Sequence, residues 1–96
     1  METFSGLDWD HSNRTKCQVH GVSIEEIEAM FAGEPRFRPD VVHSIEEQRF
    51  LATGRTAAGR ALFVIFTIRE RLDGRYVRPI SARYMHAKEA SRYDAT

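Results

Sequence analysis

Arginines gather in the second half of the chain, together with other side chains that suit work on a phosphate group. Eight such residues fall within seventeen positions: Thr67, Arg69, Arg71, Arg75, Tyr76, Arg78, Ser81 and Arg83. A guanidinium group stays protonated, binds phosphate oxygens in pairs and stacks on nucleotide bases. The cluster therefore indicates a surface for RNA or another phosphate, and the alternative is a set of ordinary surface arginines on an edge strand.

The formal net charge is zero, but the charges are distributed unevenly along the chain. Residues 1–48 carry 4 basic and 10 acidic side chains, whereas residues 49–96 carry 10 basic and 4 acidic ones. Nearly all the basic residues are arginines, since Lys16 and Lys88 are the two lysines. An arginine-rich half suits a phosphate surface, although the two halves could also simply neutralise each other across the fold.

Which of these side chains act together depends on the register of a hairpin that turns at Asp73-Gly74. In the simplest register two cross-strand pairs share one face of the sheet: Arg69 with Tyr76, and Thr67 with Arg78. In that register Ser81 and Arg83 fall on the opposite face. A β-bulge at Pro79 would return both to the first face, because one extra residue reverses the orientation of every side chain after it.

A second polar group lies on the first predicted helix. Helical spacing places four side chains on one face: Asn13, Lys16, Cys17 and His20. Lys16 and His20 are four residues apart, so both could contact a phosphate or share a proton. The alternative is a short helix anchored by Trp9 and Val19, with its polar face in water. Cys17 and His20 supply only two metal ligands and no second pair has usable spacing, so we expect neither a metal ion nor another cofactor.

Residues 54–60 (GRTAAGR) partly match a phosphate-binding loop of the GxxxxGK[ST] type. However, Arg60 replaces the lysine and Ala61 replaces the hydroxyl that would hold magnesium, and the segment joins two predicted strands instead of a strand and a helix. We therefore interpret it as a hairpin loop. The sequence contains no GxSxG elbow and no HExxH motif, so acyl transfer and metalloprotease chemistry are unsupported.

The elements that must position these side chains form one α+β domain that spans residues 1–96. Helices are predicted at residues 11–19, 23–33 and 85–93, and strands at residues 4–9, 37–43, 48–54, 61–68 and 76–83. Asp10 is a candidate N-cap, and Ser23 forms a capping box with Glu26. The strand at 61–68 is apolar on both faces, which is typical of the centre of a sheet. Pro79 lacks an N–H group, so the last strand is either at an edge or bulged there.

The composition excludes several classes of protein. With 96 residues, 42% of them hydrophobic, the chain suffices for one core. Its longest apolar run is far shorter than the roughly 20 residues of a membrane span. The first residues do not have the pattern of a secretory leader. Cys17 is the single cysteine, so an intrachain disulfide is impossible and a reducing cytosol is the simplest compartment.

Short blocks of sequence extend over nearly the whole chain: Trp9-Asp10, Lys16, His20-Gly21-Val22-Ser23, Glu25-Glu26, Gly54-Arg55, Gly59-Arg60, Thr67-x-Arg69, Ile80-Ser81-Ala82-Arg83, Glu89 and Tyr93. The HGVS block at 20–23 and the ISAR block at 80–83 are the most specific. In this order the blocks resemble the BrnT family of bacterial toxins. The resemblance implies a small cytoplasmic protein with a RelE/ParE-like fold, in which helices pack on an antiparallel sheet.

Characterised members of the BrnT family are ribonucleases that block translation, and a BrnA antitoxin holds them inactive. The resemblance therefore implies an RNA substrate and a cognate BrnA-like antitoxin. The ribbon-helix-helix part of that antitoxin would bind the operon's DNA, so the toxin would reach operator DNA only through its partner.

The resemblance and the chemistry of the side chains together suggest roles for individual residues. Four are expected to be catalytic: Arg69, Arg83, Ser81 and His20. Five are expected to bind RNA: Lys16, Arg55, Arg78, His86 and Tyr93. In a metal-free mechanism the 2′-OH of the RNA attacks the phosphate, the arginines stabilise the charge of the transition state, and His20 transfers a proton. His86 and Tyr93 are the reserve candidates for proton transfer.

Two departures remove positive charge that is common in the family. Val19 stands where a lysine is frequent, and Tyr84-Met85-His86 replaces a run that is often basic. These departures favour an alternative function, a non-catalytic protein-binding module of the same fold that acts only through a partner complex. A DNA-binding regulator is less well supported, because the exposed side of the helix at 23–33 is acidic and would repel phosphate.

Overall fold

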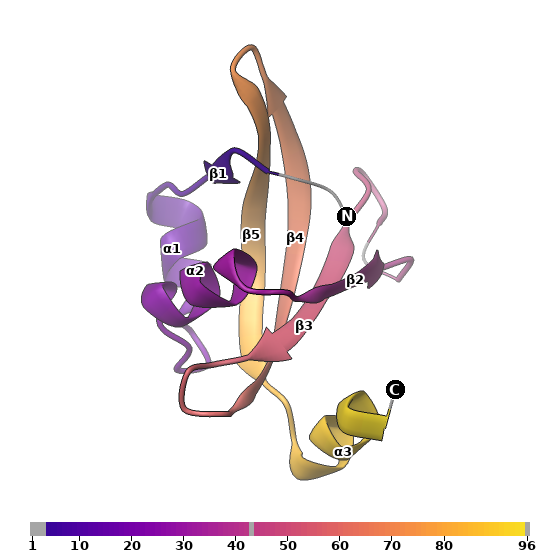
Figure 1. Cartoon of the computed structure of the whole chain (residues 1–96). Helices are drawn as coiled ribbons and strands as arrows, with labels where there is room; N and C mark the ends of the chain where they lie inside the picture. The colour runs from indigo at the N-terminus through magenta and orange to yellow at the C-terminus, as the bar shows by residue number, and fades with distance from the viewer. Residues whose placement is uncertain (1–3, 43, 96) are drawn as a thin grey trace.

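The structure is a computed structural model that describes residues 4–42 and 44–95, with the backbone alone at residues 93–95. Within these residues a five-stranded sheet is accompanied by three helices (Figure 1). The strands are β1 (Gly6–Leu7), β2 (Arg36–Pro39), β3 (Phe50–Arg55), β4 (Ala61–Arg71) and β5 (Gly74–Tyr84), and the helices are α1 (His11–Cys17), α2 (Ile24–Ala32) and α3 (Ala87–Ala95). The predicted α+β class is confirmed, whereas the RelE/ParE-like arrangement stays a prediction.

The strand order across the sheet is β1-β5-β4-β3-β2. The four strands from β2 to β5 pair antiparallel with their neighbours in sequence, which is the predicted meander. β4 is the middle strand, as its apolar pattern on both faces predicted. The sheet is not purely antiparallel, because the two-residue β1 pairs with β5 in parallel. β2 ends at Pro39, so it is shorter than the predicted strand at 37–43, and His43 lies outside the described residues.

Two helices cover one face of the sheet. One cluster of buried side chains joins them to the strands: Cys17, Val22, Ile27, Met30, Ala52, Leu62, Val64, Phe66, Val77 and Ala82. Figure 1 shows α1 and α2 next to each other beside β5 and β4, and α3 beyond the end of β5. Because alternate residues of a strand point to opposite faces, Phe63 and Ile65 of β4 point away from this core. We call the face that carries them the open face.

A β-bulge in β5 decides which residues reach the open face. Four successive pairs on that face join β4 to β5: Arg69 with Tyr76, Thr67 with Arg78, Ile65 with Ser81, and Phe63 with Arg83. The register shifts between Ile65 and Phe66, so Ile80 is the extra residue and follows Pro79 directly. The predicted bulge is thus confirmed, and it places Ser81 and Arg83 on the same face as Thr67 and Arg69.

The helix ends follow local chemistry. Asp10 caps α1 and Ser23 caps α2, each through a capping box with the residue three positions later. Both N-caps were predicted. α1 ends at Cys17, earlier than residue 19, and Val19 is 68% exposed. Val19 therefore does not anchor this helix, contrary to the alternative interpretation of α1.

The polar stripe of α1 is divided between core and solvent. Asn13 and Cys17 are buried, whereas Lys16 and His20 are exposed. The Asn13 side-chain amide donates to the carbonyl oxygens of Asp8 (2.8 Å) and Pro79 (2.9 Å), so α1 covers the edge of β5 next to the bulge. Within the described ranges, no helix is long and apolar enough to cross a membrane.

Candidate active site

Three of the four predicted catalytic residues line one cavity on the open face. Ser81 and Arg83 reach it from β5, and His20 reaches it from the turn after α1; the cavity has a volume of about 430 Å³. Its floor includes Phe63 and Ile65 of β4. The bulge therefore brings together residues that lie more than sixty positions apart in the chain.

Arg83 is held in a geometry that suits an oxyanion. Its two terminal nitrogens donate to the two carboxylate oxygens of Glu89, each at 2.9 Å, and one of them also donates to the Tyr84 carbonyl oxygen at 3.2 Å. The guanidinium carbon lies 4.6 Å from the centre of the Phe63 ring. A phosphate with two free oxygens can make the same paired hydrogen bonds as the carboxylate.

Glu89 is a site residue to which sequence reasoning gave no role. Its carboxylate accepts hydrogen bonds from the Arg83 side chain and from the His86 backbone N–H (2.9 Å), and these bonds lower the pKa of Glu89 to about 2. The same hydrogen bond to Glu89 raises the pKa of Arg83. Glu89 is therefore ionised at neutral pH, and its carboxylate occupies the paired donors of Arg83.

The position of His20 depends on contacts around the turn that follows α1. Gly21 has a φ of +89°, which an L side chain rarely adopts. The Tyr84 hydroxyl donates to Glu26 at 2.6 Å and lies 3.4 Å from the Gly21 carbonyl oxygen. This hydrogen bond raises the pKa of Tyr84 and lowers that of Glu26. The turn that carries His20 is thus attached to both α2 and β5.

Arg69 and Arg78 share the open face but lie outside this cavity. Arg69 binds Glu47 at 2.9 Å, and it is four residues along β4 from Ile65, or about 13 Å at the usual rise of a strand. Arg78 binds Asp10 at 2.8 Å and Asp8 at 3.5 Å, and its side chain is largely buried. Arg78 therefore attaches β5 to the start of α1.

The other predicted RNA-binding residues are dispersed. Arg55 donates to the Gly59 carbonyl oxygen at 2.7 Å within the β3–β4 turn, and Lys16 is exposed on α1. His86 is exposed just before α3, beside Glu89. The side chain of Tyr93 lies outside the described part of the structure. The cavity that holds Ser81 and Arg83 is not lined by Lys16, Arg55 or His86.

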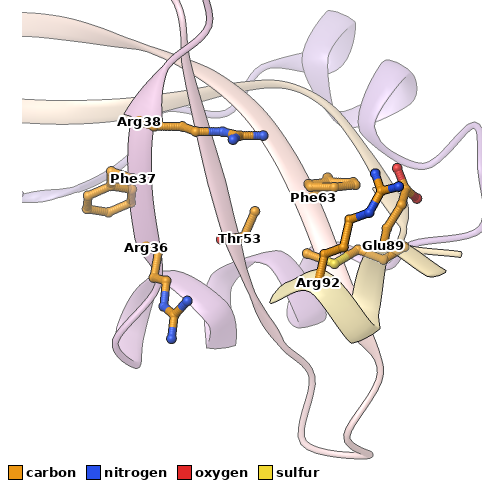
Figure 2. Close-up of a pocket in the computed structure, with 8 residues that line it drawn as sticks. Arg36, Phe37, Arg38, Thr53, Phe63, Glu89 and Arg92 are labelled. Carbon is orange, nitrogen blue, oxygen red and sulfur yellow. The ribbon is translucent and has the colours of Figure 1, made fainter. Parts of the chain in front are cut away.

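Sequence reasoning also missed three arginines that line a second cavity, of about 560 Å³. Arg36 and Arg38 come from β2 and Arg92 comes from α3 (Figure 2). The available signal was the spacing of Arg36 and Arg38, since residues two apart in a strand share a face. The intervening Phe37 points to the core side, where its ring packs 5.5 Å from that of Phe66.

The described residues supply no ready metal site, because no three His, Cys, Asp or Glu side chains among them are grouped to hold an ion. Cys17 is fully buried, and burial raises the pKa of its thiol to about 11. A thiol with this pKa stays protonated at neutral pH, so Cys17 is a core side chain.

These features define a small α+β protein whose open sheet face presents a paired-donor arginine next to a serine and a histidine. The sequence model of a family described as "Ribonuclease toxin, BrnT, of type II toxin-antitoxin system" matches residues 9–89. The match covers most of the chain, so the protein belongs to the BrnT family. Members of such a family act on RNA and have an antitoxin partner. A comparison with curated proteins finds no match.

Proposed function

We propose that the protein is a metal-independent endoribonuclease that inhibits translation in the cytoplasm and is neutralised by a BrnA-like antitoxin with a ribbon-helix-helix domain. The observation that carries the proposal is the cavity on the open face, where Arg83 is placed beside Ser81 and His20. RNA supplies its own nucleophile, so the protein needs only to align the reacting groups, stabilise charge and move protons.

In the proposed reaction the 2′ oxygen of a ribose attacks the adjacent phosphorus, and the bond from phosphorus to the 5′ oxygen breaks. A 2′,3′-cyclic phosphate and a free 5′-OH result. Arg83 donates two hydrogen bonds to the phosphate oxygens as negative charge develops on them, and Ser81 donates a third. This requires the phosphate to replace Glu89 on Arg83.

The proton transfers are assigned to histidines. With a pKa of about 2, Glu89 is too weak a base to take the proton from a ribose hydroxyl. His20 lines the cavity and takes that proton as the base. We assign the proton for the leaving 5′ oxygen to His86, whose backbone N–H donates to Glu89 at the edge of the cavity. Arg69 takes no part in the proposed reaction, because Glu47 holds it outside the cavity.

The test is cleavage of a labelled, ribosome-free RNA in EDTA by the wild type, by Arg83→Ala and by Arg14→Ala. Arg14 is an exposed arginine on α1 outside the cavity, so its loss is a matched change of charge. We expect Arg83→Ala to reduce the cleavage rate about 10²–10³-fold, the cost of removing a donor to a developing oxyanion. A folded Arg83→Ala that cleaves at the wild-type rate would contradict the assignment.

The second candidate function is a non-catalytic module that works only through a partner complex. It is favoured by the two-point ion pair between Arg83 and Glu89, since an arginine already paired by its own chain need not bind a substrate. A folded wild type that leaves ribosome-free RNA intact and does not arrest growth on expression would support this alternative.

A further inference from the structure

We propose that the cavity between β2 and α3 is a second phosphate site, which binds the RNA backbone one or more nucleotides away from the scissile phosphate. Arg38 and Arg92 are its ligands, and Arg36 lies at its rim. The proposal rests on the proposed ribonuclease function, and it assigns to Arg38 and Arg92 a role that the reaction itself does not require.

The first argument is the composition of the cavity walls. Three arginines from two separate elements line a cavity of about 560 Å³, within the roughly 300–1,000 Å³ typical of ligand sites. Figure 2 shows Arg38 reaching from β2 toward Phe63, with Arg92 on the opposite wall formed by α3. Thr53 and Phe63 form the sheet side between them.

The second argument is charge. Among the residues whose side chains are described, Glu89 is the one carboxylate that lines this cavity, and Arg83 already holds both of its oxygens. The guanidinium groups of Arg38 and Arg92 have no hydrogen bond or ion pair with any side chain or carbonyl that the structure describes. A concave surface lined by one sign of charge attracts ions of the other sign. The planar fork of arginine suits the paired oxygens of phosphate and carboxylate groups.

The third argument is continuity with the candidate active site. Arg38, Phe63 and Glu89 line both this cavity and the one that holds Ser81 and Arg83. A single polyanionic strand can therefore place one phosphate on Arg83 and a neighbouring phosphate between Arg38 and Arg92. An RNA strand has this regular series of charges, and for that reason we favour it over an acidic peptide segment.

The experiment measures binding without cleavage. A fluorescent hexanucleotide with 2′-O-methyl groups lacks the nucleophile, so its dissociation constant can be followed by anisotropy over a range of salt concentrations. The variants are Arg38→Gln and Arg92→Gln, alone and combined, because glutamine keeps part of the side-chain stem. Arg14→Gln is the matched control. Thermal unfolding confirms that each variant is folded.

We expect the double variant to bind at least about tenfold more weakly than the wild type and the control. The magnitude of the slope of log K against log salt should fall by about 0.7, since the site holds one phosphate and each single-strand phosphate contact contributes about 0.7. An unchanged affinity and slope in the folded double variant would overturn the proposal, and so would a wild type that does not bind the oligonucleotide. If the double variant loses antitoxin binding but keeps RNA binding, the proposal is also overturned, and the cavity is assigned to a protein partner.

These outcomes separate the second phosphate site from the ribonuclease function. If the wild type binds the hexanucleotide through Arg38 and Arg92 but leaves unmodified RNA intact, the site is supported and the proposed catalysis fails. If the wild type cleaves RNA and the double variant does so with unchanged affinity, the catalysis is supported and the site fails.

Discussion

Asn13 joins α1 to the bulged strand that presents Ser81 and Arg83. Its side chain is 3% exposed and makes three hydrogen bonds. The amide nitrogen donates to the carbonyl oxygens of Asp8 and Pro79 at 2.8 and 2.9 Å, and the amide oxygen accepts from the Asp10 backbone N–H at 2.7 Å. The bond to Pro79 is the one that spans from α1 to β5, next to the bulge.

Replacing Asn13 with alanine removes these three bonds and takes a donor away from the buried Pro79 carbonyl. A typical hydrogen bond contributes about 1 kcal/mol net, and a buried group left without a partner costs about 1–3 kcal/mol. We therefore expect Asn13→Ala to lower the free energy of unfolding by about 3 kcal/mol, a large share of the roughly 5–15 kcal/mol of a small domain. The melting temperature should fall by about 12–24 °C.

Urea denaturation followed by circular dichroism measures this change, with Ser12→Ala as the control. Ser12 is the exposed neighbour of Asn13 on the same helix, so its replacement should change the free energy of unfolding by less than about 0.5 kcal/mol. If Asn13→Ala also stays within that range, with an unchanged dependence on urea, the Pro79 carbonyl has another donor. The argument that α1 holds the bulged segment through Asn13 would then be refuted.

Two further predictions concern ionisable groups. The pKa of Glu89 in the folded protein, about 2, is below its ordinary value of 4.5, so its ion pair stabilises the fold above about pH 4.5, and this contribution is lost as the pH falls toward 2. The difference in melting temperature between wild type and Glu89→Gln should thus shrink between pH 6 and pH 3, and a constant difference would contradict this. Cys17 is fully buried with a thiol pKa of about 11, so a thiol reagent at pH 8 should modify it only after unfolding. Rapid modification of the folded protein would show that α1 opens locally.

Local chemistry made part of this structure predictable. The Ser23–Glu26 capping box is a short local motif, so the start of α2 could be predicted from neighbouring residues alone. Pro79 indicated either an edge strand or a bulge, because a residue without an N–H group cannot continue an interior ladder. With a bulge after Pro79, the register of the hairpin is enough to place Ser81 and Arg83 on the open face.

The parts that sequence reasoning missed depend on contacts between distant segments. One interpretation of the sequence placed Asn13 on a helix face exposed to water. Asn13 is instead buried, because its side-chain amide donates to two backbone carbonyl oxygens that have no partner in a neighbouring strand. Arg38 and Arg92 come from β2 and α3, and the chain order alone does not bring these elements to one cavity. The pairing of Arg83 with Glu89 likewise requires knowing on which side of the sheet α3 returns.

The uneven distribution of charge along the sequence is largely resolved by pairing across the fold. Three arginines of the basic half bind carboxylates of the acidic half: Arg69 binds Glu47, Arg71 binds Asp8, and Arg78 binds Asp8 and Asp10. The alternative that the halves neutralise each other is therefore correct for these residues. An arginine count overstates the RNA surface, because a paired guanidinium offers little net charge to a phosphate.

What matters for RNA is the charge that remains after this pairing. Arg38 belongs to the acidic half of the sequence, yet it has no carboxylate partner among the described residues and lies beside the cavity of Arg83. Arg83 itself is neutralised by Glu89, a residue six positions away on a short helix. A phosphate drawn in by Arg38 and Arg92 would compete with that carboxylate at close range. Binding at the second site would thus favour the exchange on Arg83 that the proposed cleavage requires.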